Sequence, residues 1–321
     1  MKKIISILLA VVMLFSLAAC GGSQDVTVNV YALKGPTGVG ILPMVSDNAE
    51  GKTQQSYNIN LVGANDEIVA KLSNKEADIA AVATNLASTL YNKLDGEITV
   101  LAVNTLGVLS LVAKGEDVTS IKDLKGKTVY TTGQGANPEY IARYILSENG
   151  LTVGEDVELK FVSEGTELVS YVTTNEKAIV IAPQPVATTI AVKDEKAQII
   201  LDMNDEWDAV SETELVMGCI VVRNEFLEKN PEAVKTFLEE YSASIEAVNA
   251  DTAAAAALCE EYGLIASAAI AKLAIPYCNI VYQDGETMKT NLSAYLNFLY
   301  GYNPASVGGT LPNDLFYYVQ K

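Results

Sequence analysis

The sequence contains no histidine, and this absence removes several kinds of chemistry. Catalysis by serine–histidine or cysteine–histidine pairs, histidine metal sites and imidazole acid–base chemistry are all excluded. The cysteines after Cys20 show no C-x-x-C spacing, so a structural zinc site is not expected. No glycine-rich stretch completes a phosphate-binding or dinucleotide-binding loop. We therefore predict a protein that is not an enzyme and that needs no metal and no cofactor.

Positive charge is also scarce. The 321 residues include 22 Lys and Arg against 40 Asp and Glu, which gives a formal net charge of −18. Arg143 and Arg223 are the only arginines, one inside a predicted helix and one past a predicted strand. Neither position suits a bidentate clamp on a carboxylate or phosphate. Nucleic acid and anionic lipid are therefore poor partners, because both require a basic face.

Long apolar runs are limited to the first residues. Lys2 and Lys3 precede an apolar run from Ile4 to Ala19, which is shorter than the roughly 20 residues that span a bilayer. This pattern predicts a signal peptide over residues 1–19. Residues 17–21, Leu-Ala-Ala-Cys-Gly, resemble a bacterial lipobox, which implies cleavage before Cys20 and lipid on that cysteine. Residues 20–25 would then tether a monomeric body to the extracytoplasmic face of the cell membrane.

The remaining cysteines form an odd set in an exported protein. Cys259 and Cys278 flank one predicted helical hairpin and could pair, with reduced thiols as the alternative. Cys219 lies in an apolar strand and is expected to be a small buried hydrophobe.

Apolar β-rich runs alternate with helical patterns in two α/β units, at about 25–105 and 113–214, and the chain is helical from Asn224 onwards. The predicted helices include residues 37–47, 186–193, 224–229, 252–262 with Asp251 as the N-cap, and 313–318. This alternation predicts parallel sheets with helices on both faces. The runs 108–113 and 215–222 are interpreted as paired crossings between two lobes, which form a hinge beside a cleft. The predicted lobes are residues 26–107 with 220–321, and residues 108–219. The helical tail is expected to pack on the first lobe.

Ligands of open α/β sheets bind beyond the carboxyl ends of the strands. In the first unit this rule selects the bend Gly35-Pro36-Thr37-Gly38, with Thr37 as the expected helix N-cap. An ordinary βα turn is the alternative there. The rule also selects Thr84 and Asn85 after the third strand, where helix capping is an equal alternative. Asn104 and Thr105 follow the fourth strand.

In the second unit, a bend before the predicted helix at 138–149 supplies Gln134, Gly135 and Asn137, and is expected to face the first bend. Gln184 lies between two prolines, and its amide can donate and accept. Glu214 is a candidate for a cationic or donor group, with a solvated edge position as the alternative. A small anion held by two helix starts and a neutral or zwitterionic heteroaromatic both fit these groups. The rings considered for stacking, each of which could equally belong to the core, are Tyr31, Tyr91, Tyr130, Tyr140 and Trp207.

Several segments carry a family resemblance. They are residues 111–114, residues 120–129, and residues 217–226 followed by Asn230-Pro231-Glu232 and Phe237. Together they resemble the substrate-binding lipoproteins of ABC importers, in the nitrate, sulfonate, taurine and thiamine-pyrimidine-precursor group. The resemblance implies a type II periplasmic-binding-protein fold and delivery of a small molecule to an ABC permease. A surface receptor or antigen, or a pyrimidine-precursor enzyme on the same fold, are the alternatives.

Overall fold

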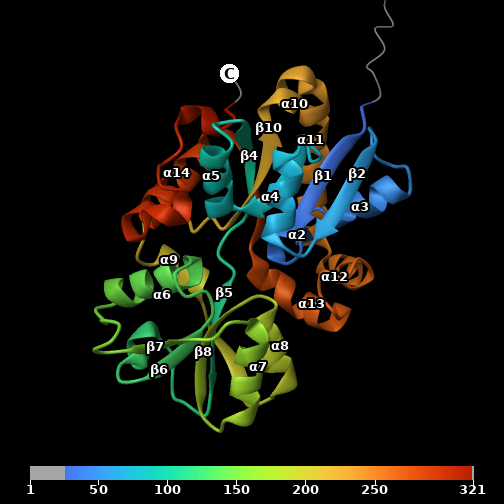
Figure 1. The fold of residues 1–321 in the computed structure, drawn as a ribbon. Coiled ribbons are helices and arrows are strands. Elements are labelled where there is room, and N and C mark those ends of the chain that lie inside the picture. Colours follow the sequence, from blue (N-terminus) through green and yellow to red (C-terminus); the bar gives the residue numbers. More distant parts are fainter. Residues whose placement is uncertain (1–25, 320–321) are drawn as a thin grey trace, which may run out of the picture.

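The computed structural model describes residues 26–319. The predicted signal peptide, the predicted lipid site Cys20 and the tether lie outside this range. The described chain forms two lobes that are joined at a narrow waist (Figure 1). The first lobe comprises residues 26–105 and 218–319, and the second lobe comprises residues 109–208. This arrangement agrees with the predicted two-lobed α/β fold.

The first lobe is built on a six-stranded sheet with the order β11-β4-β10-β3-β1-β2. Its strands are β1 (Val28–Leu33), β2 (Tyr57–Val62), β3 (Ile79–Ala83), β4 (Ile98–Thr105), β10 (Gly218–Arg223) and β11 (Ile280–Gln283). Its helices are α2 (Pro36–Val39), α3 (Leu42–Ala49), α4 (Asn65–Ser73), α5 (Thr84–Lys93), α10 (Asn224–Lys229), α11 (Pro231–Ala250), α12 (Thr252–Glu261), α13 (Ala268–Ala274) and α14 (Gly285–Tyr302).

The second lobe is built on a five-stranded sheet with the order β7-β6-β8-β5-β9. Its strands are β5 (Leu109–Lys114), β6 (Thr128–Thr131), β7 (Glu158–Phe161), β8 (Ala178–Pro183) and β9 (Ala197–Asp202). Its helices are α6 (Asn137–Glu148), α7 (Gly165–Thr174), α8 (Val186–Lys193) and α9 (Met203–Asp208). The sequence analysis missed α9.

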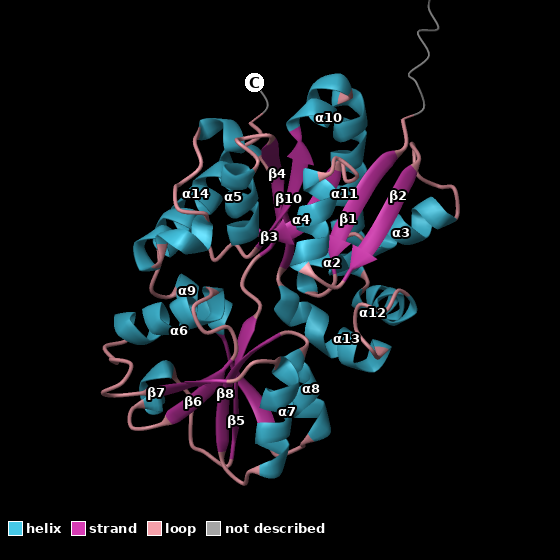
Figure 2. Ribbon diagram, in the orientation of Figure 1, coloured by secondary structure: helices cyan, strands magenta, loops and turns pink. Residues whose placement is uncertain are grey.

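Both sheets are mixed, which corrects the expectation of parallel sheets. β1 pairs in parallel with β2 and β3, whereas β10 runs antiparallel between β3 and β4. Figure 2 shows the arrowhead of β2 pointing toward the second lobe and that of β10 pointing away. In the second sheet β6 is parallel to β7 and β8, and β5 is antiparallel to β8 and β9.

Side chains alternate between the two faces of the first sheet along its central strands, and each face is covered by a different set of helices. Ile79 and Ala81 of β3 join the core beneath α3, α11 and α12, whereas Ala80 and Val82 join the core beneath α4, α5 and α14. Successive strand residues point to opposite faces, so a strand buried on both sides has to be apolar throughout. The continuous apolar runs of the sequence therefore become the central strands.

β5 and β10 are not paired crossings, which corrects a second expectation. β5 pairs only within the second sheet and β10 only within the first. The lobes are instead joined by two short segments, residues 106–108 and 209–217. The Gly107 N–H donates to Asn204 Oδ1 at 3.0 Å, and Asn279 Nδ2 donates to the Gly107 carbonyl at 2.6 Å. Side chains from both sides of the waist thus hold the first connection.

The C-terminal region is less uniformly helical than expected. It contributes β11, an edge strand that pairs with β4, and it ends in a short 3₁₀ turn, Asp314–Phe316, where a helix over 313–318 was expected. α14 packs on α5 and β4 of the first lobe, as expected, but it also contacts α6. α13 likewise contacts α8 of the second lobe. The tail therefore touches both lobes.

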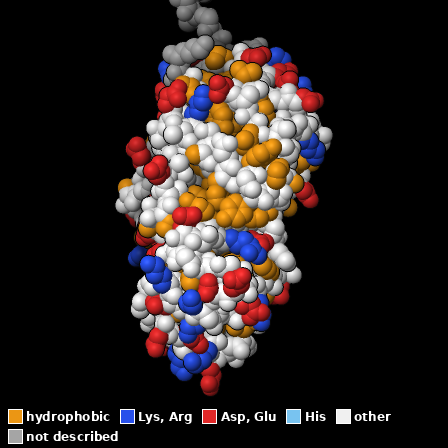
Figure 3. All heavy atoms as spheres, turned by 90° about the vertical axis from the view of Figure 1, so that its left-hand side faces the viewer, with side chains coloured by type: hydrophobic (Ala, Val, Ile, Leu, Met, Phe, Trp, Pro, Cys, Tyr) orange, Lys and Arg blue, Asp and Glu red, His pale blue; other side chains and the backbone are white. Residues whose placement is uncertain are grey.

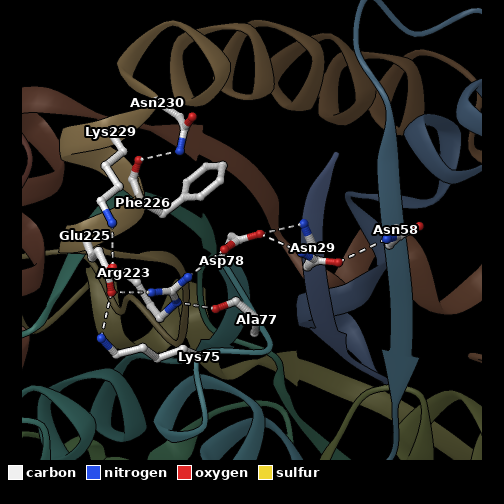
Figure 4. Close-up of polar contacts among 10 residues, drawn as sticks. All are labelled: Asn29, Asn58, Lys75, Ala77, Asp78, Arg223, Glu225, Phe226, Lys229 and Asn230. Atoms are coloured by element: carbon white, nitrogen blue, oxygen red, sulfur yellow. Dashed lines mark hydrogen bonds and ion pairs between the residues drawn. The ribbon is translucent and has the colours of Figure 1, made fainter. Parts of the chain in front are cut away.

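An ion-pair network closes the end of the first sheet that lies away from the waist (Figure 4). Arg223 donates through Nη2 to Asp78 at 2.7 Å and through Nε to the Ala77 carbonyl at 2.7 Å. Asp78 also accepts from the Asn29 N–H and side-chain amide. Removing one partner of such a buried pair costs about 3–5 kcal/mol. Arg223 is therefore fully engaged in joining β10, β3 and β1.

Within residues 26–319, no helix combines the length and apolar character that a bilayer-spanning helix requires. Cys219, Cys259 and Cys278 are buried free thiols, which corrects the suggested Cys259–Cys278 pairing. Burial raises the pKa of each thiol, to about 11 for Cys259. The described residues contain no cluster of acidic and cysteine side chains suited to a metal ion.

Candidate functional site

The carboxyl ends of the parallel strands in both lobes meet at the waist. Ala83, the last residue of β3, pairs with Gly218, and Gly218 also pairs with Thr105 at the end of β4. In the second lobe, Pro183 at the end of β8 pairs with Leu109, the first residue after the connection. The segments after β1, β3, β6 and β8 therefore border the junction, as the rule for open α/β sheets requires.

The first bend, residues 35–38, differs locally from the expectation. Gly35 is the N-cap of α2 with φ +115°, and Pro36 occupies the first helical turn. Thr37 therefore lies inside α2 and does not cap it. A Cβ on Gly38 would lie 2.5 Å from the Leu33 carbonyl oxygen, so only glycine fits there. The predicted long helix over 37–47 is instead split into α2 and α3.

Asn104 and Thr105 hold the first bend through side-chain hydrogen bonds. Asn104 is 1% exposed, and its amide donates to the Thr37 carbonyl at 3.1 Å and to the Tyr241 hydroxyl at 2.8 Å. The Thr105 hydroxyl donates to Asn104 Oδ1 at 3.0 Å. Both amide hydrogens and the amide oxygen of Asn104 are thus engaged. These residues position the bend, and ligand contact by Asn104 or Thr105 stays a prediction.

Thr84 and Gln184 are also built into the structure. Thr84 is fully buried and donates to the Val216 carbonyl at 2.9 Å. Gln184 is 2% exposed, donates to Ser110 Oγ at 3.1 Å and accepts from Thr188 Oγ1 at 2.8 Å. The Gln184–Pro185 peptide bond is cis. Both side chains thus make structural hydrogen bonds, and ligand contact by either residue stays a prediction.

Glu214 lies on the second connecting segment and is partly buried. Its Oε2 accepts from Gln283 Nε2 at 2.6 Å and from Asn291 Nδ2 at 2.8 Å. The donors that contact Glu214 in the structure are therefore side chains of β11 and α14, and ligand contact by Glu214 stays a prediction. The contact fixes the connecting segment to the tail.

The second bend, residues 133–137, is held by its own helix. Gln134 and Gly135 are exposed. The Gly135 N–H donates to Glu139 Oε2 at 2.7 Å, and the Tyr140 hydroxyl donates to the Gly135 carbonyl at 2.7 Å. The other oxygen of Glu139 accepts from Arg143 Nε at 2.7 Å. A carboxylate therefore already occupies the positive end of α6, where an anion would otherwise bind.

Asn137 of the second bend faces Asn85 of the first lobe, so the structure brings these two predicted residues together. Asn137 Nδ2 lies 3.4 Å from Asn85 Oδ1. Asn137 is 6% exposed, and its Oδ1 has no hydrogen-bond partner among the described residues. Asn137, and not Pro138, is the first residue of α6. Among the described residues, no hydrogen bond or ion pair joins the first bend directly to the second.

Sequence analysis missed several side chains that shape the junction. Tyr241 of α11 supports Asn104, and burial raises the pKa of its hydroxyl. Asn279 has φ +46° and reaches the Gly107 carbonyl, while Asn204 reaches the Gly107 N–H. Asparagine tolerates the left-handed region, so Asn279 directly before an apolar run was a usable turn signal. Nothing in the local sequence marks Tyr241 or Asn204.

Each of the proposed stacking rings packs against another side chain of the protein. Trp207 is 1% exposed, donates to the Thr213 carbonyl at 2.6 Å and packs against Tyr144 and Phe298. This aromatic cluster joins α9, α6 and α14. Figure 3 views this side and shows hydrophobic side chains gathered on the first lobe just above the waist. Of the remaining candidates, Tyr31 lies under Lys71, Tyr91 contacts Phe316, Tyr130 stacks on Tyr171 and Tyr140 contacts Tyr302.

Several surface pockets of the described residues lie on the first lobe. One of about 430 Å³ lies between α11 and β11, and one of about 260 Å³ lies beside Arg223. Neither includes a predicted ligand residue. A site between the lobes is therefore supported by the contacts across the waist and not by these pockets.

Comparison with known families and structures supports this architecture. Residues 98–255 match the family model described as NMT1/THI5 like. No curated protein matches the sequence. The family match begins at β4 and ends within α12, so it includes the whole second lobe.

Solved structures match over nearly the whole chain. An ABC transporter protein from Parabacteroides distasonis is 23% identical over 92% of this chain and 100% of its own, with a TM-score of 0.77. The periplasmic aliphatic sulphonate binding protein SsuA from Escherichia coli is 11% identical, over 93% of this chain and 94% of its own, with a TM-score of 0.68. The alkanesulfonate-binding protein SsuA from Xanthomonas axonopodis pv. citri, bound to MOPS, is 12% identical over 91% and 96%, with a TM-score of 0.58. The overall fold is thus shared with these proteins, so the chain has the type II periplasmic-binding-protein fold, and residues 98–255 of it are similar to the NMT1/THI5-like family.

Proposed function

We propose that this chain is the solute-binding component of an ABC importer, which captures a small molecule between its lobes and delivers it to a permease. The observation that carries the proposal is the meeting of strand ends from both sheets at a waist with only two connections. The family and fold matches support the same role.

The mechanism is a shift between open and closed arrangements of the lobes. A ligand that contacts both lobes favours the closed form by its extra contacts there. The approach of Asn85 and Asn137 to 3.4 Å supports a closed arrangement in which both helix starts reach one small molecule. Residues 26–105 with 218–319, and residues 109–208, would move as the two bodies.

The cellular location of the protein is part of the proposal. A signal peptide over 1–19 and lipid on Cys20 would place a monomer at the outer face of the cell membrane. Mass spectrometry of the protein from the membrane fraction tests this directly. A mature N-terminus at Cys20 carrying acyl chains is expected, and an unmodified Cys20 would contradict the anchor.

An enzyme on the same fold is the second candidate, and the NMT1/THI5-like match favours it. The resemblance implies that the pyrimidine-precursor enzymes use histidine, which this chain lacks. Turnover of a bound small molecule by the purified protein would support the enzyme. Binding without turnover would support transport.

The ligand site is tested with the small molecules that purified protein releases on unfolding. Mass spectrometry identifies them, and each is then added back in a thermal unfolding experiment. A ligand at one hundred times its Kd stabilises the wild type by about 2.7 kcal/mol. The double variant Thr37→Trp, Gln134→Trp should lose this stabilisation, because the indole ring added to each bend would fill the space between the lobes. Asn60→Trp, on the exposed face of β2, is the matched control and should keep it.

A further inference from the structure

Asn137 presents a buried acceptor that the described residues leave without a donor. The residue is 6% exposed and its Oδ1 lacks any hydrogen-bond partner. A buried carbonyl oxygen without a donor is unfavourable, and most such groups in folded proteins are paired. The position is therefore incomplete without another molecule.

The amide of Asn137 points across the junction. Its Nδ2 lies 3.4 Å from Asn85 Oδ1, which is long for a hydrogen bond. Asn85 lies in the first turn of α5, a helix of 10 residues, and Asn137 begins α6, a helix of 12 residues. The unpaired oxygen thus lies between two helix starts that belong to different lobes.

The charges around this oxygen oppose a bound oxyanion. Glu139 caps the Gly135 N–H and is paired with Arg143. At the same edge of the second sheet, Glu167 caps the Ser163 and Glu164 N–H groups at the start of α7. Lys34 is exposed beside Gly263, and Arg223 is engaged by Asp78 at the far end of the first sheet. Protein carboxylates thus occupy the helix starts that a sulfonate would need.

We propose that Asn137 selects a neutral or cationic ligand that donates an N–H or O–H hydrogen bond to its Oδ1, and that acceptor-only oxyanions are disfavoured. This inference rests on the proposed solute-binding function and narrows its ligand class. It separates the chain from the sulfonate-binding proteins that share its fold, and it makes Asn137 a specificity-determining residue.

The test uses matched pairs of compounds that differ in donor capacity and charge. Ethanesulfonamide with ethanesulfonate, and benzamide with benzoate, are each added at millimolar concentration to the mature chain in thermal unfolding and calorimetric titrations. The same titrations are run on Asn137→Asp and Asn137→Leu. Aspartate at this position can only accept, so it retains binding only if the ligand donates. Asn60→Asp and Asn60→Leu are the matched controls.

The expected result is that the amide and sulfonamide bind the wild type at least tenfold more tightly than the two anions. Asn137→Asp should keep that affinity, Asn137→Leu should lose about tenfold, and the controls should match the wild type. Tighter binding of the anions, with loss in Asn137→Asp, would overturn the donor assignment while leaving solute binding intact. No binding of any of the four compounds would also overturn it. The unfolding temperature without ligand shows whether each variant is folded.

Discussion

The two glycine-bearing bends look alike in sequence but are held in different ways. The first, at 35–38, is fixed by Asn104 and Tyr241, which lie 67 and about 200 positions further along the chain. The second, at 133–137, is fixed by Glu139 and Tyr140 of the helix that it begins. The first bend is therefore part of a long-range core, whereas the second is a local structure that keeps exposed residues and one unpaired acceptor. Polar residues at strand ends thus indicate a binding site only after their hydrogen bonds have been accounted for.

The largest effect is expected from Asn104→Leu, which removes the support of the first bend. The Thr37 carbonyl and the Tyr241 and Thr105 hydroxyls would all lose their partner in a buried place. We expect the free energy of unfolding, measured by urea titration, to fall by about 3 kcal/mol. Asn60→Leu on exposed β2 should change it by less than about 0.5 kcal/mol. If Asn104→Leu and Asn60→Leu lowered the free energy of unfolding equally, Asn104 would not support the first bend.

A smaller effect is expected from Glu139→Ala at the second bend. The variant removes the cap on Gly135, but that backbone is exposed and water can replace the carboxylate. We expect a loss of about 0.5–1 kcal/mol in the same titration. Glu148→Ala, at the other end of α6, is the matched control and should cause no loss, since a carboxylate there opposes the helix dipole. A loss as large as that of Asn104→Leu would show that the second bend is also tied into the core.

The smallest effect is expected from Asp202→Asn at the end of β9, on the same edge as the second bend. Burial raises the pKa of Asp202 above 3.8, although the Asn204 N–H that it caps acts in the opposite direction. The folded protein then holds this proton where the unfolded chain has lost it, so stability falls as pH rises through the folded pKa. Asparagine keeps the cap without the charge.

The variant should therefore be more stable than the wild type at neutral pH by less than about 1 kcal/mol. The difference should vanish below pH 3.8, which urea titrations across this range would detect. Asp47→Asn, at an exposed position of α3, provides the matched control. A variant that is less stable than the wild type at neutral pH would show that ionised Asp202 supports the junction.

The sequence predicted most elements of the fold because their signals are local. The helices over 186–193 and 224–229 have the predicted bounds, and Asp251 caps α12 through the Ala253 and Ala254 N–H groups as expected. The antiparallel placement of β10 and the short edge strand β11 were missed, because strand direction depends on partners far along the chain. The break between α2 and α3 was missed for a related reason, since Gly40 packs closely against Ile245 of α11.

The candidate site was predicted in outline but not in detail. The rule on strand ends selected Asn85 and Asn137, which meet at the waist. It also selected Asn104, Thr84 and Gln184, whose polar groups are used by the protein itself. Their partners include Tyr241 and Val216, which are distant in sequence. A single sequence does not show which buried amides have such partners.

The central position of β10 has a consequence for how the chain folds as it emerges. β10 lies between β3 and β4, yet it is made only after the entire second lobe. The second lobe is a continuous segment whose strands can pair as soon as they are available, whereas β3 and β4 must wait with unpaired edges for a strand more than one hundred residues away. Closing such a long loop is slow and leaves apolar edges exposed in the meantime. We therefore expect the second lobe to fold first, and the half that begins the chain to be completed last.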